Sequence, residues 1–331
     1  MKIQQNFLII LLITALLIIA FLSLFLGAAD IPARDILLAL TGGGDTSTRI
    51  IILELRLPRV VLGIMAGASL GLSGAALQGL LRNPLADPGI VGVSATAGLG
   101  AVMAIYFGLS STFPLAIQIM SMAGALLATF ILSVISRRDS SVLTLILAGI
   151  GISSLATAAL SLTMNFAPNP MSLQDMIMWL LGSLENRTRT DILLAGPFII
   201  GGWVIMRGTG QGLDASSLGE DTAQSLGIDL KKLRLKVILG SAISVGAVVS
   251  VCGAIGFVGL VVPHIIRRLI GHGPGRLLLP SALMGGILLT IADLITRIPL
   301  GHGQLRLGVV TAFVGAPLFL AIIYKTRGAM R

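Results

Sequence analysis

Charged side chains are scarce in this chain: Asp, Glu, Lys and Arg make up 11% of its 331 residues, and 55% are hydrophobic. A soluble domain averages about 25% charged residues, so too little polar surface exists to cover a water-soluble globule. The solvent must be mostly lipid, which a helix of about 20 apolar residues can cross. The apolar runs are also too long and continuous for a membrane β-barrel. We therefore expect an all-α, polytopic membrane protein.

Cysteine is nearly absent, and the signatures of several chemistries are missing. The single Cys252 excludes an intrachain disulfide, and a small buried hydrophobe is the role that suits it. No G-x-x-x-x-G-K-[ST] phosphate loop is present. No Cys/His cluster has metal-ligand spacing. We expect no metal site, no cofactor, no nucleic-acid partner and no catalytic residue, so any ATP hydrolysis belongs to a separate chain.

Apolar runs separated by polar or proline breaks predict ten spans within one transmembrane domain over residues 1–331. The eighth is short and interrupted by glycine and proline. The first could be a signal peptide, but its length and single preceding lysine favour a retained span. The predicted spans are 7–27, 57–81, 89–108, 114–135, 141–166, 191–207, 234–253, 257–270, 277–298 and 308–324.

Positive charges predict the orientation of these spans, because Lys and Arg are enriched in cytoplasmic loops. With the N-terminus inside, the inner loops and tails hold fifteen Lys and Arg residues, and the outer loops hold eight. An even number of spans then returns the C-terminus to the inside. The expectation is an N-in, C-in protein with ten transmembrane helices.

Glycine is abundant, and ionisable side chains within the spans are rare. Gly63, Gly67 and Gly71 share one face of the second span, which indicates close helix packing. Asp293 is the one acid well inside a span; Arg297 lies one turn later and can pair with it. Ion-coupled carriers usually carry embedded acids or bases. Their scarcity argues against coupling to an ion gradient.

Residues 213–232 interrupt the apolar sequence with "LDASSLGEDTAQSLGIDLKK", on the predicted cytoplasmic side. Ser216 or Ser217 can cap a first helix, with Gly227 as its stop, and Asp229 can cap a second helix. Acidic Glu220 and Asp221 suit the first turn, and Ala223, Leu226 and Ile228 add a small apolar surface. The insert is either a docking element for a cytosolic partner or an ordinary solvated loop; the pattern alone leaves both open.

Six runs, in order along the chain, carry a family resemblance. They are "LRLPRVVLGIMAGASLGLSGAALQGLLRNPLADPGIVGVSATAGLGA" (55–101), "WLLGSLENR" (179–187), "LGEDTAQSLGID" (218–229), "GAIGFVGLVVPHIIRRLIG" (253–271), "LLLPSALMGGILLTIADLITR" (277–297) and "LGVVTAFVGAPLF" (307–319). Together they resemble the FecCD-type permeases, membrane subunits of binding-protein-dependent ABC importers of iron–siderophore complexes, heme and cobalamin. The resemblance implies the type II ABC importer permease fold in the bacterial cytoplasmic (inner) membrane. It also implies a cytoplasmic ABC ATPase dimer, a periplasmic or lipoprotein binding protein, and a second permease copy, identical or homologous.

The resemblance also implies roles for particular residues. Arg56, Arg59 and Arg297 match arginines that dock the binding protein, although snorkelling to the interface would also explain them. The insert becomes the coupling segment that contacts the ATPase, through Ser217, Leu218, Gly219, Glu220, Asp221, Ala223, Leu226 and Gly227. Small and apolar residues of the second span suit either the translocation path or plain helix packing: Met65, Gly67, Ala68, Leu70 and Ala75.

Two runs depart from the family pattern. The usual E-L-P-[VI]-G before the last span is "QLRLG" at 304–308, which puts the outer gate and the substrate subclass in question. After the Pro-His run the family often has an Asp-His-Arg type turn on the inner face; here the turn is "GHGPGR" at 271–276. The expected function is import of a metal chelate, with ferric siderophore ahead of heme or cobalamin. An ion-coupled secondary transporter is the alternative, and a membrane enzyme is disfavoured because nucleophiles and acids do not cluster at one interface.

Overall fold

A computed structural model describes residues 2–27, 29–138, 142–298 and 305–327. Helices dominate this described part, and no β-strand occurs in it. The longer helices are α1 (Lys2–Phe25), α4 (Leu57–Leu81), α5 (Val93–Tyr106), α7 (Ala116–Arg138), α8 (Val142–Asn165), α10 (Arg189–Met206), α13 (Leu230–Cys252), α14 (Val258–Ile270), α15 (Pro274–Thr296) and α16 (Leu307–Arg327). The shorter ones are α2 (Ala33–Leu40), α3 (Thr46–Ile50), the π-helix η1 (Ile51–Arg56), the 3₁₀-helix η2 (Pro88–Val91), α6 (Leu109–Thr112), α9 (Pro170–Leu180), α11 (Thr209–Ser216) and α12 (Glu220–Ser225).

Each predicted span coincides with one of the longer helices, so the all-α prediction is confirmed. In the described residues, seven helical segments are long and apolar enough to cross a membrane, and α5 and α16 contribute shorter apolar stretches. The eighth predicted span is α14, which has only 13 residues. The number of crossings and the N-in orientation stay predictions.

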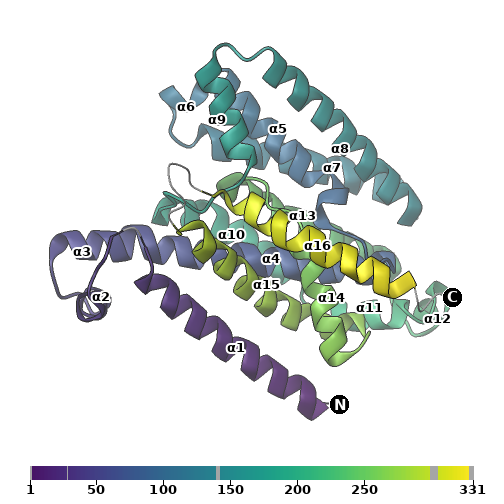
Figure 1. The fold of residues 1–331 in the computed structure, drawn as a ribbon. Helices are drawn as coiled ribbons and strands as arrows, with labels where there is room; N and C mark the ends of the chain where they lie inside the picture. Colours follow the sequence, from purple (N-terminus) through teal and green to yellow (C-terminus); the bar gives the residue numbers. More distant parts are fainter. Residues whose placement is uncertain (1, 28, 139–141, 299–304, 328–331) are drawn as a thin grey trace.

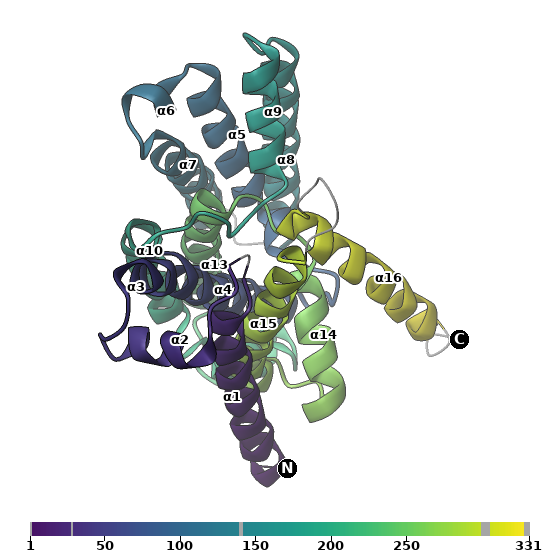
Figure 2. The same ribbon diagram turned by 60° about the vertical axis from the view of Figure 1, so that its left-hand side comes forward.

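The helices form two groups (Figures 1 and 2). One holds α5 to α9, and the other is built around α4, α13, α14 and α15, with α1 and α16 at its outside. The start of α1, the pair α11 and α12, and the end of α16 lie toward one end of the molecule, whereas α2 and α3 lie toward the other (Figure 1). This arrangement places the polar insert near the start of α1 and the end of α16, as the N-in, C-in topology requires.

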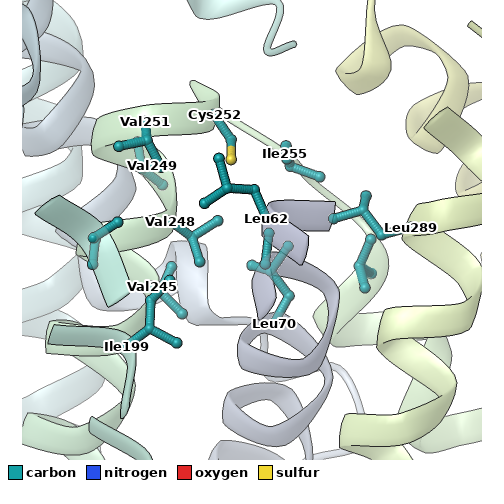
Figure 3. Packing of buried hydrophobic residues seen from close by; sticks show 14 of the residues in the cluster. Leu62, Leu70, Ile199, Val245, Val248, Val249, Val251, Cys252, Ile255 and Leu289 are labelled. Atoms are coloured by element: carbon teal, nitrogen blue, oxygen red, sulfur yellow. The ribbon is translucent and has the colours of Figure 1, made fainter. Parts of the chain in front are cut away.

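The core lies where α4, α10, α13 and α15 meet. Leu62 and Leu70 of α4 pack near Val245 and Val248 of α13, with Leu289 of α15 beside them (Figure 3). All five side chains are buried. Helix association in lipid depends on van der Waals fit, because lipid tails are as apolar as the side chains. Tight packing, rather than exclusion of water, therefore holds this core together.

Glycine lets α4 approach its neighbours at backbone distance. A Cβ at Gly67 would overlap the carbonyl oxygen of Gly285, and one at Gly71 would overlap that of Ser281, both on α15. One turn further, a Cβ at Gly74 would overlap the carbonyl oxygen of Gly259 on α14. The packing role predicted for the glycine repeat is confirmed, because only residues without a side chain fit these crossings.

The second span begins earlier than predicted. The predicted span starts at residue 57, but the helix is continuous from Thr46 to Leu81, and Pro58 lies within it. The π-helical turn η1 precedes the proline, and the N–H of Leu57 donates to the carbonyl of Ile52, five residues back. A proline ring clashes with the carbonyl four residues before it, and a π-turn widens the helix at that point. Asn83 and Pro84 follow the helix, which ends at Leu81 as the predicted span does.

Candidate functional sites

The polar insert at 213–232 contains the end of α11, all of α12 and the start of α13. Ser216 and Ser217 do not cap α12, so that prediction is wrong: both lie at the end of α11, an unpredicted helix, and donate back to the carbonyls of Gly212 and Asp214. Gly219, at φ +119°, precedes α12 instead. Serine was a reasonable cap candidate, but the earlier helix already uses both hydroxyls.

The other local predictions for the insert are confirmed. Glu220 and Asp221 occupy the first turn of α12. Gly227, at φ +81°, ends the helix, and its N–H donates to the carbonyl of Gln224 over 2.9 Å. Asp229 then caps α13 by accepting from the N–H of Lys232 over 3.0 Å. That hydrogen bond lowers the pKa of the Asp229 carboxyl, because it favours the charged form.

Two polar contacts fix the insert to different long helices. Arg234 of α13 donates to Glu220 of α12 over 2.6 Å, with the arginine side chain 8% exposed. Asp214 of α11 accepts from the N–H of Gly275, at the start of α15, over 2.8 Å. Ala223 of α12 is buried, as expected of one member of the small apolar surface predicted for the insert. The insert is therefore linked to α13 through α12 and to α15 through α11.

The insert also presents apolar side chains to the outside. Leu218 is 68% exposed and Leu226 is 62% exposed, on either side of α12. They flank α12, which lies at the end of the molecule that also holds the start of α1 and the end of α16 (Figure 1). Large apolar side chains that are exposed on an otherwise polar segment are typical of a contact with another protein.

Three arginines predicted to dock a binding protein make contacts within the chain. Arg59 of α4 pairs with Asp293 of α15 at 2.8 Å, and Arg297 pairs with the same carboxylate at 2.6 Å. The predicted local pair of Asp293 and Arg297 is thus confirmed. Arg56 donates to the carbonyls of Leu24 and Phe25 at the end of α1. Of the three, Arg59 keeps the most exposed side chain, at 20%.

The residues proposed for the translocation path lie inside the protomer. Gly67 faces α15 directly, and Leu70 belongs to the core in Figure 3. Ala75 is buried among side chains of α1, α14 and α15. Ala68 is nearly buried, and Met65 packs against the core. Helix packing, one of the two roles that the sequence left open, is the one that this geometry favours.

An open, polar cavity of about 340 Å³ lies beside the segment that follows α9. An apolar groove of about 610 Å³ lies on the neighbouring surface, between the end of α9, residues 254–257 and the start of α16. Three segments separate the two hollows: the one after α9, the one after α13 and the start of α16. The N–H of Ser183 donates to the carbonyl of Cys252, and the N–H of Leu307 donates to that of Gly182, so hydrogen bonds join these segments. The sequence did not predict either hollow, because each combines residues far apart in the chain.

The two departures from the family pattern fall at opposite ends of the molecule. Gln304 lies outside the described residues, whereas Arg306 stands in the wall of the polar cavity. The second departure, at 271–276, is a turn that begins with Gly271, at φ +90°, and leads into Pro274 at the start of α15. Within the described part of the chain, no three His, Cys, Asp or Glu side chains are grouped to hold a metal ion.

Comparison with known proteins identifies relatives along most of the chain. It is 42% identical over 280 residues to the vitamin B12 import system permease protein BtuC of Vibrio cholerae, covering 83% of each chain. It is 36% identical to the cobalamin import system permease protein BtuC of Halobacterium salinarum, covering 90% of this chain and 80% of that one.

A solved structure shares the fold over nearly the whole length. It is described as an inward-facing conformation of a metal-chelate type ABC transporter, with a TM-score of 0.85 and 30% identity. The match covers 96% of this chain and 98% of that chain. The family model of the FecCD transport family matches residues 15–325. This chain therefore belongs to the FecCD transport family and is a multi-pass permease subunit of an ABC importer in the inner membrane.

Proposed function

We propose that this permease carries cobalamin, or a closely similar metal chelate, into the cytoplasm. The observation that carries the proposal is the 42% identity to a vitamin B12 permease over 83% of both chains. This identity supports cobalamin as the cargo ahead of ferric siderophore, which the sequence-based expectation put first. Ferric siderophores and heme remain the other metal chelates to compare.

The driving energy enters through a separate ABC ATPase dimer that contacts the coupling segment. The exposed Leu218 and Leu226 supply the apolar anchors, and Glu220, Asp221 and Gly227 shape the helix between them. The ion pair of Glu220 with Arg234 and the hydrogen bond between Asp214 and Gly275 support this role, because they link the segment to α13 and α15. The rest of the proposed contact is Ser217, Gly219 and Ala223.

A substrate-binding protein delivers the cargo to the opposite end of the permease. Arg59 is the arginine best placed to meet an acidic residue of that protein, because part of its side chain is exposed. Arg56 and Arg297 support the site by holding the end of α1 beside it. Charge pairs of this kind mainly increase the association rate and set the docking orientation.

A second permease copy, identical or homologous, completes the route for the cargo. The apolar groove at α16 supports this part of the proposal, because Phe313 on its rim is 81% exposed. Such a groove suits the apolar surface of another permease. A chelate larger than the groove then passes between two copies rather than through one.

Reconstitution tests the proposal directly. The permease, a candidate ATPase and a candidate binding protein are placed in proteoliposomes, and uptake of labelled cobalamin, ferric siderophore and heme is measured with ATP inside or absent. The proposal expects ATP-dependent cobalamin uptake that requires all three proteins. Uptake that persists without ATP and stops with an uncoupler would instead support the ion-coupled alternative.

The docking role of Arg59 has its own test. Arg59→Gln is expected to weaken binding of the substrate-binding protein, whereas Arg189→Gln, which removes an exposed arginine paired with Glu54, is not. Both variants remove one positive charge, so an equal loss of affinity in both would assign the effect to net charge rather than to a docking contact at Arg59. Binding is measured on purified transporter with labelled binding protein at low and high salt, since screening weakens a charge contact.

A further inference from the structure

The polar cavity beside the segment after α9 contains two arginines whose Nε donors have no acceptor among the described residues. Arg187 and Arg306 both line it, together with Trp179, Asn186 and the acids Asp175 and Glu185. The Nε atoms of both arginines are buried and have no acceptor among the described residues. A buried donor without an acceptor costs about 1–3 kcal/mol, so two in one cavity indicate a missing acceptor.

The acids nearby do not supply that acceptor. Arg187 approaches Asp191 only to 3.7 Å, and Arg306 approaches Glu185 only to 3.6 Å. Asp191 is already engaged at the start of α10, where it accepts from the N–H of Thr188 over 2.9 Å. By contrast, the buried pair of Arg59 and Asp293 closes to 2.8 Å. Both cavity guanidiniums are therefore loosely held and can turn toward another oxyanion.

We propose that this cavity is a subsite for an oxyanion group of the transported chelate, a phosphodiester or a carboxylate. A guanidinium presents a planar fork of N–H donors that matches these groups. A cavity of about 340 Å³ is at the small end of the range of ligand sites, and it suits one arm of a chelate rather than the whole molecule. Trp179 adds a flat apolar wall.

The neighbouring groove extends the subsite. One segment contributes to both hollows, with Cys252 and Gly253 on the polar side and Ala254, Gly256 and Phe257 on the apolar side. An amphipathic chelate that passes between two permease copies can place its charged arm against the arginines and its apolar body along the groove, at the face where the second copy is proposed to lie. The loose ion pairs with Glu185 and Asp191 compete with the ligand, so binding is weak enough to permit release.

The subsite rests on the proposed import function, and the main test compares two cargos that differ at the anionic arm. Cobalamin carries an internal phosphodiester, which cobinamide lacks. Uptake of both is measured with wild-type, Arg306→Gln, Arg187→Gln and Arg306→Lys permease reconstituted with ATPase and binding protein. Arg189→Gln is the matched control, because Arg189 is exposed and pairs with Glu54 outside the cavity.

We expect Arg306→Gln and Arg187→Gln to raise the KM for cobalamin about tenfold, the effect of losing one charge-assisted hydrogen bond. Cobinamide uptake should be unchanged, which also shows that the variants fold. Arg306→Lys should restore only part of the difference, because lysine keeps the charge without the fork. Equal effects on both cargos would overturn the proposal.

The oxyanion could instead come from an acidic residue of the binding protein. Affinity of the cargo-free binding protein for the transporter separates the two sources. The proposal expects the same affinity for wild-type and Arg306→Gln permease; a marked loss would overturn the assignment to the cargo.

A direct binding measurement needs neither uptake nor partner proteins. The chain has two tryptophans, Trp179 and Trp203, so Trp203→Phe leaves the cavity tryptophan as the single indole. Titration of the purified full-length permease with inorganic phosphate and citrate should give a saturable change in its fluorescence, and Arg306→Gln should move its midpoint to about tenfold higher anion concentration. No change with either anion, or the same change in the variant, would contradict the subsite while leaving the import function intact.

Discussion

Asp293 of α15 holds two arginines at once, Arg59 of α4 at 2.8 Å and Arg297 of its own helix at 2.6 Å. Its side chain is 3% exposed. Arg297 also donates to the carbonyl of Ser23 over 2.7 Å, so the cluster joins α1, α4 and α15. A carboxylate embedded in this way is a structural tie, and its charge is already compensated, which removes it as a site for a coupling ion.

Replacing Asp293 with Asn is expected to destabilise the permease strongly. Removing one partner of a buried ion pair leaves uncompensated charge and typically costs about 3–5 kcal/mol. The midpoint of thermal unfolding in detergent is the measurement. Glu54→Gln is the control, because its pair with Arg189 is about half exposed, and exposed pairs contribute about 0–1 kcal/mol. Equal, small shifts for both variants would mean that the cluster does not tie the helices.

Gly67→Ala is expected to weaken the crossing of α4 and α15. The new methyl group would overlap the Gly285 carbonyl, and overpacking a tight site costs about 1–3 kcal/mol. Gly151→Ala on α8 is the matched control, since a Cβ there has no neighbour within 4 Å. That variant should be neutral or more stable, because alanine favours the helix by about 0.5–1 kcal/mol. Thermal unfolding compares the two, and a similar loss in both would contradict the packing.

Gly227→Trp should separate a docking surface from a solvated loop. A Cβ at Gly227 meets nothing within 4 Å, and Gly208 has the same φ of +81° and the same open surroundings. Both tryptophan variants therefore carry the same backbone cost, about 1–2 kcal/mol. If the ATPase covers Gly227, its variant alone should hydrolyse ATP without uptake in the reconstituted transporter. Uncoupling by both variants, or by neither, would count against the coupling role.

Much of this fold follows from local sequence pattern. The lengths of the apolar runs predict the ten long helices, and the glycine repeat predicts a packing face on α4. The four-residue spacing predicts the ion pair of Asp293 with Arg297. Short amphipathic helices were missed, although Asp45 and Asn169 mark the starts of α3 and α9 by accepting from backbone N–H groups. Both cap residues could have been recognised in the sequence as helix starts.

Contacts between distant segments lie beyond such patterns. Arg59 and Asp293 are 234 residues apart, and nothing local to Arg59 distinguishes an internal partner from an acidic residue on another protein. The same holds for Arg187 and Arg306, which the chain brings to one cavity from separate loops. Path residues proposed from composition, such as Gly67 and Leu70, could not be told from packing residues until their neighbours were known.

The central claim, that the segment 213–232 faces the cytoplasm and receives the force of an ATPase, is tested most directly by thiol labelling. The native Cys252 is 1% exposed and should stay silent, so Ser217→Cys in the segment and Ser47→Cys in α3 each provide one reactive thiol at an exposed position. With a membrane-impermeant maleimide, the account predicts labelling of Ser217→Cys only in inside-out vesicles and of Ser47→Cys only in right-side-out vesicles. Labelling of Ser217→Cys in right-side-out vesicles alone would contradict the orientation and the coupling together.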